Sequence, residues 1–182
     1  SEAGNTQAMC NLGKCYEHGK GVDVDQTKAI ELYFQAADKG NAQALFELGM
    51  CYKDGKGVEQ DQLKAVEYFQ FSSGKRNGNA TCMLGECHEM GIGVENNYEL
   101  AVQLYNISIE QGNEKALINL GNCYENGLGV EKNLSEAFNL YYKAFNIGLV
   151  DGTFNVGRLL EEGKGVEKNE YKALSFYQNA AN

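Results

Sequence analysis

The stretch that decides the fold runs from Leu120 to Ala144 and reads LGNCYENGLGVEKNLSEAFNLYYKA. The chain repeats this pattern five times at a fixed spacing of 36 residues, with no residue inserted or lost between the copies. A period of about 20 to 50 residues is typical of a solenoid, in which each unit packs only on its neighbours. We therefore predict one array over residues 1–182. Its repeats cover approximately 5–40, 41–76, 77–112, 113–148 and 149–182.

Each repeat is predicted to form two antiparallel helices. Apolar residues recur at helical spacing from Asn113 to Asn126, and this first helix stops at Gly127, because glycine readily adopts the left-handed conformation that closes a helix. A second helix starts after Asn133, whose side-chain oxygen can accept from the free N–H groups of the first turn. Small residues recur in both helices, such as Gly121 and Ala137, and indicate a close crossing. We therefore predict an all-α fold of five 36-residue helix pairs.

Between Ala44 and Phe69 the sequence follows the pattern A-x-x-x-L-G-x-x-Y-x-x-G-x-G-V-x-x-D/N-x-x-K/x-A-x-x-x-Y, with phenylalanine at the last place. This pattern resembles the Sel-one-like repeat family, which is related to the tetratricopeptide repeats. The tetratricopeptide repeat itself fits less well, because it has about 34 residues and a proline near its end, whereas this chain contains no proline. The resemblance implies a right-handed α/α superhelix whose first helices line a concave surface, used as an adaptor or scaffold that holds other proteins.

Composition restricts the classes of partner. The net charge is −9, and no block of lysine or arginine stands out. A nucleic-acid-binding protein concentrates positive charge along its contact face, and an anionic membrane surface would repel an acidic chain. No apolar run approaches the roughly 20 residues of a membrane span. We therefore predict a protein or peptide partner, no nucleic acid and no membrane insertion.

The two ends of the sequence suggest a piece of a longer protein. Ser1 falls almost on a repeat boundary, and no initiator methionine precedes it. The last helix carries Leu174, Phe176 and Tyr177, with no distinctly polar capping helix after it. Solenoids generally need such caps for solubility. The sequence therefore predicts either further repeats outside this piece or end-to-end self-association of two chains.

The six cysteines are predicted to be buried free thiols. One of their positions holds Leu159 in the fifth repeat, so it is apolar, and free cysteine packs as a small hydrophobe. Equivalent Cα atoms of helices stacked about 8–10 Å apart are also too distant for a disulfide. Secreted relatives carry one disulfide within each repeat, but here no second helix has a cysteine, which predicts a reducing compartment, most simply the cytoplasm. The two equivalent groups are Cys15, Cys51, Cys87 and Cys123, and Cys10 and Cys82.

No catalytic, cofactor or metal site is predicted. Residues 72–75 spell S-x-x-K, the nucleophile motif of β-lactamases and penicillin-binding proteins, an activity attributed to cysteine-rich relatives, but the rest of that signature is missing. Cys82, Cys87 and His88 crowd into one first helix. However, Cys82 and Cys87 are separated by about 140° around a helix, so they cannot bind one ion from the same face.

The variable polar residues lie on the first helices. One stripe, which begins at Gln7 in the first repeat, contains residues at the i, i+4, i+7 and i+11 spacing that change between repeats. Its asparagines can both donate to and accept from an extended peptide. Lys115 and Asn119 with Arg158 are similar to the carboxylate clamps of tetratricopeptide domains, although Asp151 departs from that pattern. The candidate partner-binding residues are Asn11, Lys14, Glu47, Met83, Glu86, Lys115, Asn119, Asn122, Asn155 and Arg158.

These observations predict a non-catalytic protein-interaction module that binds a peptide or protein on the concave surface. Three alternatives stay open. The first is a solvated polar face without a ligand, the second is an enzyme of the β-lactamase or penicillin-binding type, and the third is a structural oligomerisation module.

Overall fold

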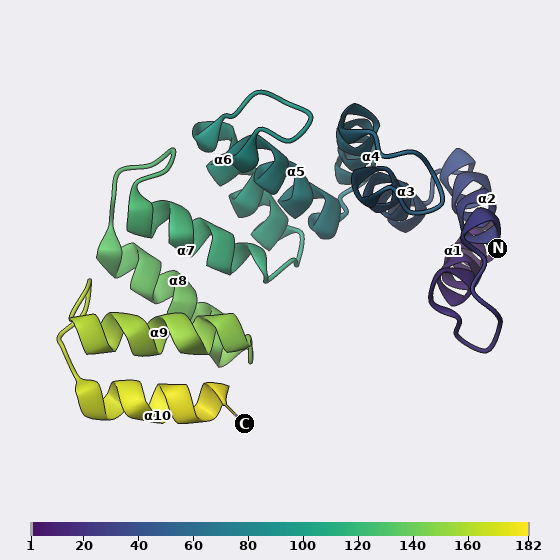
Figure 1. Cartoon of the computed structure of the whole chain (residues 1–182). Coiled ribbons are helices and arrows are strands. Elements are labelled where there is room, and N and C mark those ends of the chain that lie inside the picture. Colours follow the sequence, from purple (N-terminus) through teal and green to yellow (C-terminus); the bar gives the residue numbers. More distant parts are fainter. Residues whose placement is uncertain (1, 182) are drawn as a thin grey trace. The chain divides into compact units, whose positions relative to one another are not determined.

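The computed structural model describes residues 2–181, which contain ten helices and no strand (Figure 1). The helices are α1 (Glu2–His18), α2 (Gln26–Asp38), α3 (Ala42–Asp54), α4 (Gln62–Gly74), α5 (Gly78–Met90), α6 (Tyr98–Glu110), α7 (Ala116–Asn126), α8 (Leu134–Asn146), α9 (Val150–Glu162) and α10 (Glu170–Ala180). Two helices per repeat confirm the predicted all-α solenoid class. None of these helices is both long and apolar enough to cross a membrane.

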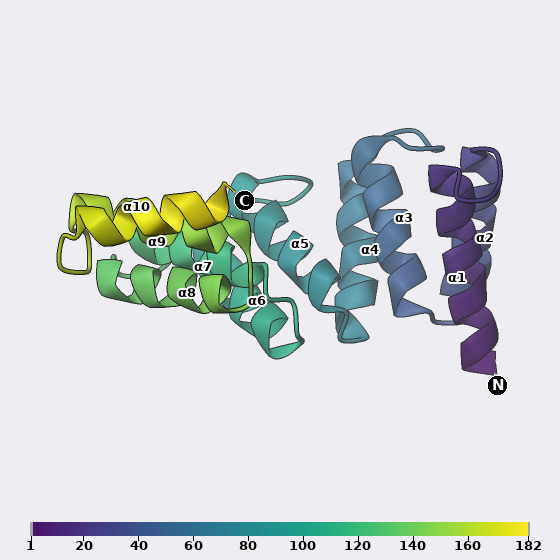
Figure 2. The same cartoon turned by 90° about the horizontal axis from the view of Figure 1, so that it is seen from below.

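The chain divides after Asn96 into two compact units. The first unit contains α1 to α5, and the second contains α6 to α10. In the first unit, α1 packs beside α2 and α3 beside α4, as Figure 2 shows. In the second unit, α7 packs beside α8 and α9 beside α10 (Figure 1). Within each unit, the second helix of one repeat also contacts the first helix of the next repeat.

The glycine in the middle of α1, α3, α7 and α9 makes room for an aromatic ring of the second helix of the same repeat. A Cβ added to Gly121 would lie 2.5 Å from Cε1 of Tyr141, and one added to Gly49 would lie 2.5 Å from Phe69. Both rings are fully buried. The sequence predicted the close crossing and attributed it to small residues such as Ala137. The structure shows that an aromatic ring of the second helix fills the space that the glycine leaves.

The two glycines of each G-x-G-V turn have different tasks. The first, such as Gly127, closes the helix in the left-handed conformation, as predicted. The second, such as Gly129, lies against the first turn of the second helix in the preceding repeat, where an added Cβ would overlap the carbonyl group of Tyr98. Ser135 Oγ in turn donates to the carbonyl oxygen of Gly165 at 3.2 Å. The turn therefore forms part of the contact between neighbouring repeats.

Side-chain caps fix the start of each second helix. The side-chain oxygen of Asn133 accepts from the backbone N–H of Glu136 at 3.0 Å. Equivalent bonds begin the other second helices, which confirms the predicted register. The capping residues are Asp25, Asp61, Asn97, Asn133 and Asn169.

Candidate functional site

In the first unit, two of the predicted binding residues form an ion pair between neighbouring first helices. Lys14 Nζ of α1 lies 2.7 Å from Glu47 Oε1 of α3, which also accepts from Gln43 Nε2 at 2.7 Å. Asn11 is exposed one turn earlier on α1 and accepts from Gln7 Nε2 at 3.1 Å. The structure therefore brings Lys14 and Glu47 together and leaves the amide of Asn11 at the surface.

The predicted residues of α5 are less accessible. Met83 and Glu86 are both half-buried, and the Cys82 thiol lies 3.9 Å from Glu86 Oε1. Among residues 2–181, no group of three or more histidine, cysteine, aspartate or glutamate side chains could hold a metal ion. The soft ligands that crowd this helix in the sequence thus do not assemble into a metal centre among the described residues.

In the second unit, two asparagines and two hydrogen-bond donors form a network around Glu125, and the two donors bind its carboxylate directly. Arg158 of α9 donates to both of its oxygens, each at 2.7 Å. The hydroxyl of Tyr141, on α8, lies 2.9 Å from Glu125 Oε2 and 2.7 Å from Asn122 Oδ1, and its single proton is shared between these two acceptors. Asn155 Oδ1 accepts a further bond from Arg158 at 3.2 Å. We call these five residues the Glu125 network, and it joins α7, α8 and α9.

The electrostatics of the Glu125 network favour its charged form. The hydrogen bond from Arg158 is the largest cause that holds the pKa of Glu125 below its usual range, and the Tyr141 hydroxyl lowers it further. Burial is the largest cause that raises the pKa of Tyr141, so this hydroxyl stays a donor. The bidentate geometry between Arg158 and Glu125 is the strong form of a charge-assisted pair. Two adjacent repeats are thereby joined by a fixed polar contact.

Of the three residues of the predicted carboxylate clamp, Lys115, Asn119 and Arg158, only Arg158 belongs to the Glu125 network. The structure brings Asn122, Asn155 and Arg158 together, as their places on one stripe suggested. Lys115 is exposed just before α7, and Asn119 is half-buried within it. Arg158 already binds a carboxylate of its own chain. A partner's carboxylate would therefore have to displace Glu125, a residue outside the predicted stripe.

A comparison of the repeats could have identified Glu125 from the sequence, because two positions within each repeat change together. Tyrosine in the second helix occurs together with glutamate in the first, and their side chains bond at 2.6 Å in Tyr33 and Glu17. The second repeat replaces both members at once, by Lys53 and Phe69. The two positions therefore change together in this chain. The described pairs of this kind are Tyr33 with Glu17, Tyr141 with Glu125, and Tyr177 with Glu161.

All six cysteines are free thiols, and five of them are buried. Burial raises the pKa of Cys10 and Cys87 to about 11 and that of Cys51 to about 12. The prediction of an apolar core position is thus confirmed for five cysteines. It was wrong for Cys15, which is only half-buried, because α1 has no described helix from a preceding repeat packed against it.

This difference predicts selective alkylation. At pH 8 we expect iodoacetamide to modify Cys15 at least about tenfold faster than Cys51, because the thiolate is the reactive form and a buried thiol forms little of it. Peptide mass spectrometry after timed labelling measures each rate. In concentrated urea the six rates should become similar. Equal rates for Cys15 and Cys51 in the folded protein would contradict the burial pattern.

The residues of the S-x-x-K motif are engaged in the fold. Ser72 is fully buried, and its hydroxyl donates to the carbonyl oxygen of Ala42 at 2.7 Å. The hydroxyl of Ser73 bonds to that of Thr81 at 2.7 Å. Lys75 follows the end of α4 and is exposed. A serine without access to solvent cannot attack a bulky substrate, so the motif is not arranged as a nucleophilic site.

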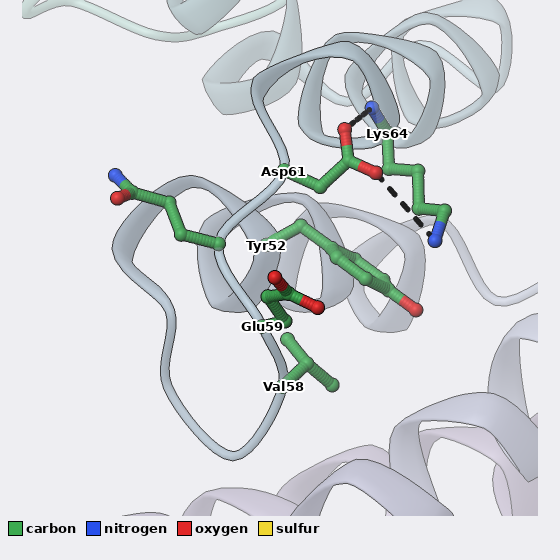
Figure 3. Close-up of a pocket in the computed structure, with 6 residues that line it drawn as sticks. Tyr52, Val58, Glu59, Asp61 and Lys64 are labelled. Carbon is green, nitrogen blue, oxygen red and sulfur yellow. Dashed lines mark hydrogen bonds and ion pairs between the residues drawn. The ribbon is translucent and has the colours of Figure 1, made fainter.

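A shallow depression of about 460 Å³ lies over the turn of the second repeat (Figure 3). Its wall includes the ring of Tyr52, and Lys64 Nζ lies 5.2 Å from the ring centroid. Asp61 accepts from the backbone N–H of Lys64 at 3.0 Å, which is the largest cause that lowers the pKa of Asp61. The first repeat has the same arrangement, with Lys28 at 4.4 Å from the ring of Tyr16. These residues therefore belong to the recurring framework.

Comparisons with known proteins agree on the repeat type. A family model described as the Sel1 repeat matches five segments, residues 6–41, 42–73, 78–113, 114–149 and 150–182. A solved Sel1 repeat protein from Oxalobacter formigenes is 28% identical, with 97% of this chain and 73% of that chain covered and a TM-score of 0.87. A comparison with curated protein sequences gave no significant match.

Two further solved structures are similar at the level of sequence. One is c5321, a protective antigen present in uropathogenic Escherichia coli strains, which is 31% identical over 99% of this chain with a TM-score of 0.88. This chain spans only 38% of that protein. The other is cysteine rich protein B of Helicobacter pylori, which is 30% identical over 67% of this chain and 87% of that chain, with a TM-score of 0.51.

Proposed function

The chain belongs to the Sel1 repeat family, and on that premise we propose that it is a non-catalytic interaction module that binds a partner protein or peptide through its first helices. The observation that carries this proposal is a contrast between two kinds of position. Leu48, Leu84 and Leu120 are buried and identical in three successive repeats. Two residues further along, the partly accessible positions hold Met50, Glu86 and Asn122, which differ in every repeat. A constant core thus presents a varying surface, as recognition of a particular partner requires.

The exposed groups indicate the chemistry of the partner. Asn11 and Asn126 present amides that can donate and accept at the same time, which suits the backbone of an extended peptide. The net charge of −9 favours a partner with basic side chains. The ion pairs Lys14 with Glu47 and Arg158 with Glu125 hold neighbouring first helices in place beside these amides. We therefore propose that the partner contributes an extended, basic segment.

Two other features support the absence of catalysis and a reducing environment. The hydroxyl of Ser72 is buried and donates to a backbone carbonyl, so it is not available as a nucleophile. All six cysteines are free thiols, which is typical of proteins kept in a reducing compartment such as the cytoplasm. We propose on this basis that the module acts there by binding alone.

A capture experiment tests the proposal. The variant carries Asn11→Ala, Lys115→Ala and Asn126→Ala. These substitutions remove three exposed side chains, two on first helices and one directly before α7. Arg158 and Asn155 stay unchanged, because their replacement would break the Glu125 network. We expect the wild type to capture a partner from the lysate of the source organism, and the purified partner to bind the variant at least about tenfold more weakly by calorimetry.

The matched control replaces two exposed amides on second helices, Gln70→Ala on α4 and Asn139→Ala on α8. This control should bind the partner as the wild type does, and circular dichroism should show the same helix content for all three proteins. Equal binding by the wild type and the triple variant would contradict the first-helix surface. An equal loss of affinity in the triple variant and the control would show that binding is not specific to the first helices, which would also contradict the proposal.

A further inference from the structure

One carboxylate of the first unit is mostly buried, yet one of its oxygens receives no hydrogen bond from the described residues. The Glu17 side chain on α1 is only 10% exposed. Its Oε2 atom accepts from the Tyr33 hydroxyl at 2.6 Å, whereas the contact made by Oε1 is Lys56 Nζ at 4.0 Å. A largely buried carboxylate is costly unless its oxygens are paired. A further donor at Oε1 would therefore be favourable.

Lys56 does not complete the pairing of Glu17. Its Nζ atom lies closer to Asp54 Oδ2, at 3.4 Å, and its side chain is 50% exposed. A separation of 4.0 Å is longer than a hydrogen bond, and an ion pair with so exposed a lysine contributes little. The neighbouring carboxylate of Glu47, on α3, is already paired with Lys14 at 2.7 Å. Of these two carboxylates, Glu17 is therefore the one without a close counter-charge.

The equivalent carboxylate in the second unit shows which group completes such a site. Glu125 also binds a tyrosine hydroxyl, and its two oxygens accept from Arg158 of the next repeat, each at 2.7 Å. In the repeat that follows Glu17, the place of Arg158 is taken by Met50. A thioether has no proton to donate. The first junction thus has the carboxylate and the tyrosine of the Glu125 network but lacks the guanidinium.

The junction between the second and third repeats also has opposite charges at these two positions. There the place of the carboxylate holds Lys53, and the place of the guanidinium holds Glu86, so the signs are exchanged. Burial is the largest cause that raises the pKa of the Cys87 thiol, and Glu86 raises it further while Lys53 lowers it, so both charges lie near this thiol. Of the two junctions within the first unit, only the one at Glu17 has a charge opposite an uncharged residue.

We propose that the partner supplies the missing cation, as the guanidinium of an arginine that binds Glu17 in the way that Arg158 binds Glu125. This inference rests on the proposed function and assigns one contact to the basic segment of the partner. Arginine suits the site better than lysine, because its planar fork can donate to both carboxylate oxygens at once. Met50 is half-buried, and a flexible methionine side chain can rearrange to pack on the arginine stem.

A double-mutant cycle tests the geometry of the site without a partner. Met50→Arg supplies the guanidinium from the chain itself, and Glu17→Gln removes the charge while keeping an oxygen that accepts from Tyr33. We expect the change in melting temperature caused by Met50→Arg to be more favourable by at least about 3 °C when Glu17 is present than when it is replaced. The same change in both backgrounds would overturn the proposal.

The captured partner tests the contact between the two molecules. Glu17→Gln removes the carboxylate and Met50→Arg occupies it, so we expect each to lower the affinity for the partner at least about tenfold by calorimetry. Glu67→Gln is the matched control, because Glu67 is an exposed carboxylate on α4, and it should bind as the wild type does. A partner that discriminates against the triple variant but binds Glu17→Gln as tightly as the wild type would overturn this inference and leave the proposed function standing.

A small probe separates the site from the proposed function where no partner is captured. Acetyl-arginine amide is titrated at millimolar concentrations into protein with carbon-13 in its methionine methyl groups, and nuclear magnetic resonance follows the Met50 signal. We expect a saturable shift that is absent in Glu17→Gln and absent with acetyl-citrulline amide, whose side chain is uncharged. Met90, which is 64% exposed at the end of α5, should not respond. A Met50 signal that ignores the arginine amide, or responds equally to both amides, would overturn the proposal.

Discussion

Replacing Gly129 with alanine is expected to lower the free energy of unfolding by about 2–5 kcal/mol, as the sum of backbone strain and overpacking. Gly129 has a φ of +67°, which costs an L-residue about 1–2 kcal/mol. The new methyl group would also overlap the carbonyl of Tyr98, and a backbone group cannot rotate away as a side chain can. The overlap lies between two neighbouring repeats, on whose contacts a solenoid depends. A urea titration followed by circular dichroism measures the loss.

Gly21 supplies the matched control for this prediction. Its φ of +75° is similar, but an added Cβ meets no atom within 4 Å. Gly21→Ala should therefore show the backbone strain alone, about 1–2 kcal/mol. The difference between the two variants measures the contact between repeats. If the two variants lost the same free energy of unfolding, the second glycine of the turn would be required for its backbone conformation only. The close contact with Tyr98 would then not contribute to stability.

The second glycine of the turn shows which features of the fold could be predicted from the sequence and which could not. The regular spacing of Gly127 and Gly129, together with the asparagine caps, was sufficient to predict two helices per repeat and where each begins. These signals are local, because a left-handed residue or a cap depends on its own turn of chain. The contact of Gly129 with Tyr98 joins residues almost one repeat apart. A pattern of identical copies shows that both residues recur, but it does not show which segment approaches the other.

The candidate site was predicted less completely for a related reason. Placing Asn122, Asn155 and Arg158 on one helical stripe was possible, because helical periodicity fixes which residues share a face. Glu125 lies one helical turn beyond Asn122 and was not included in the stripe, so Arg158 was assigned to an external carboxylate. Only a comparison between repeats connects Glu125 with Tyr141. Cys15 differs from its equivalents for yet another reason, since its exposure depends on what packs beside α1.

Removing the carboxylate of Glu125 is expected to have the second largest effect. Glu125→Gln should lower the free energy of unfolding by about 1.5–3 kcal/mol, the usual contribution of hydrogen bonds to charged groups. The variant loses the bidentate ion pair with Arg158 and leaves that guanidinium half-buried without its counter-charge. Glu162→Gln is the control, because Glu162 is exposed and lies 3.7 Å from Arg158. An exposed pair of this kind should contribute less than about 1 kcal/mol.

The pH dependence gives an independent check on Glu125. Its pKa is lowered from 4.5 in the folded protein, so its contribution to stability is fully present above pH 4.5. The contribution is lost as the pH falls through the lower pKa of the folded state, because the carboxylate that Arg158 binds becomes protonated. The wild type and Glu125→Gln should therefore differ most near pH 7 and converge in acid. A difference that stays constant from pH 7 to pH 3 would show that the charge of Glu125 does not stabilise the network, and that its shape alone does.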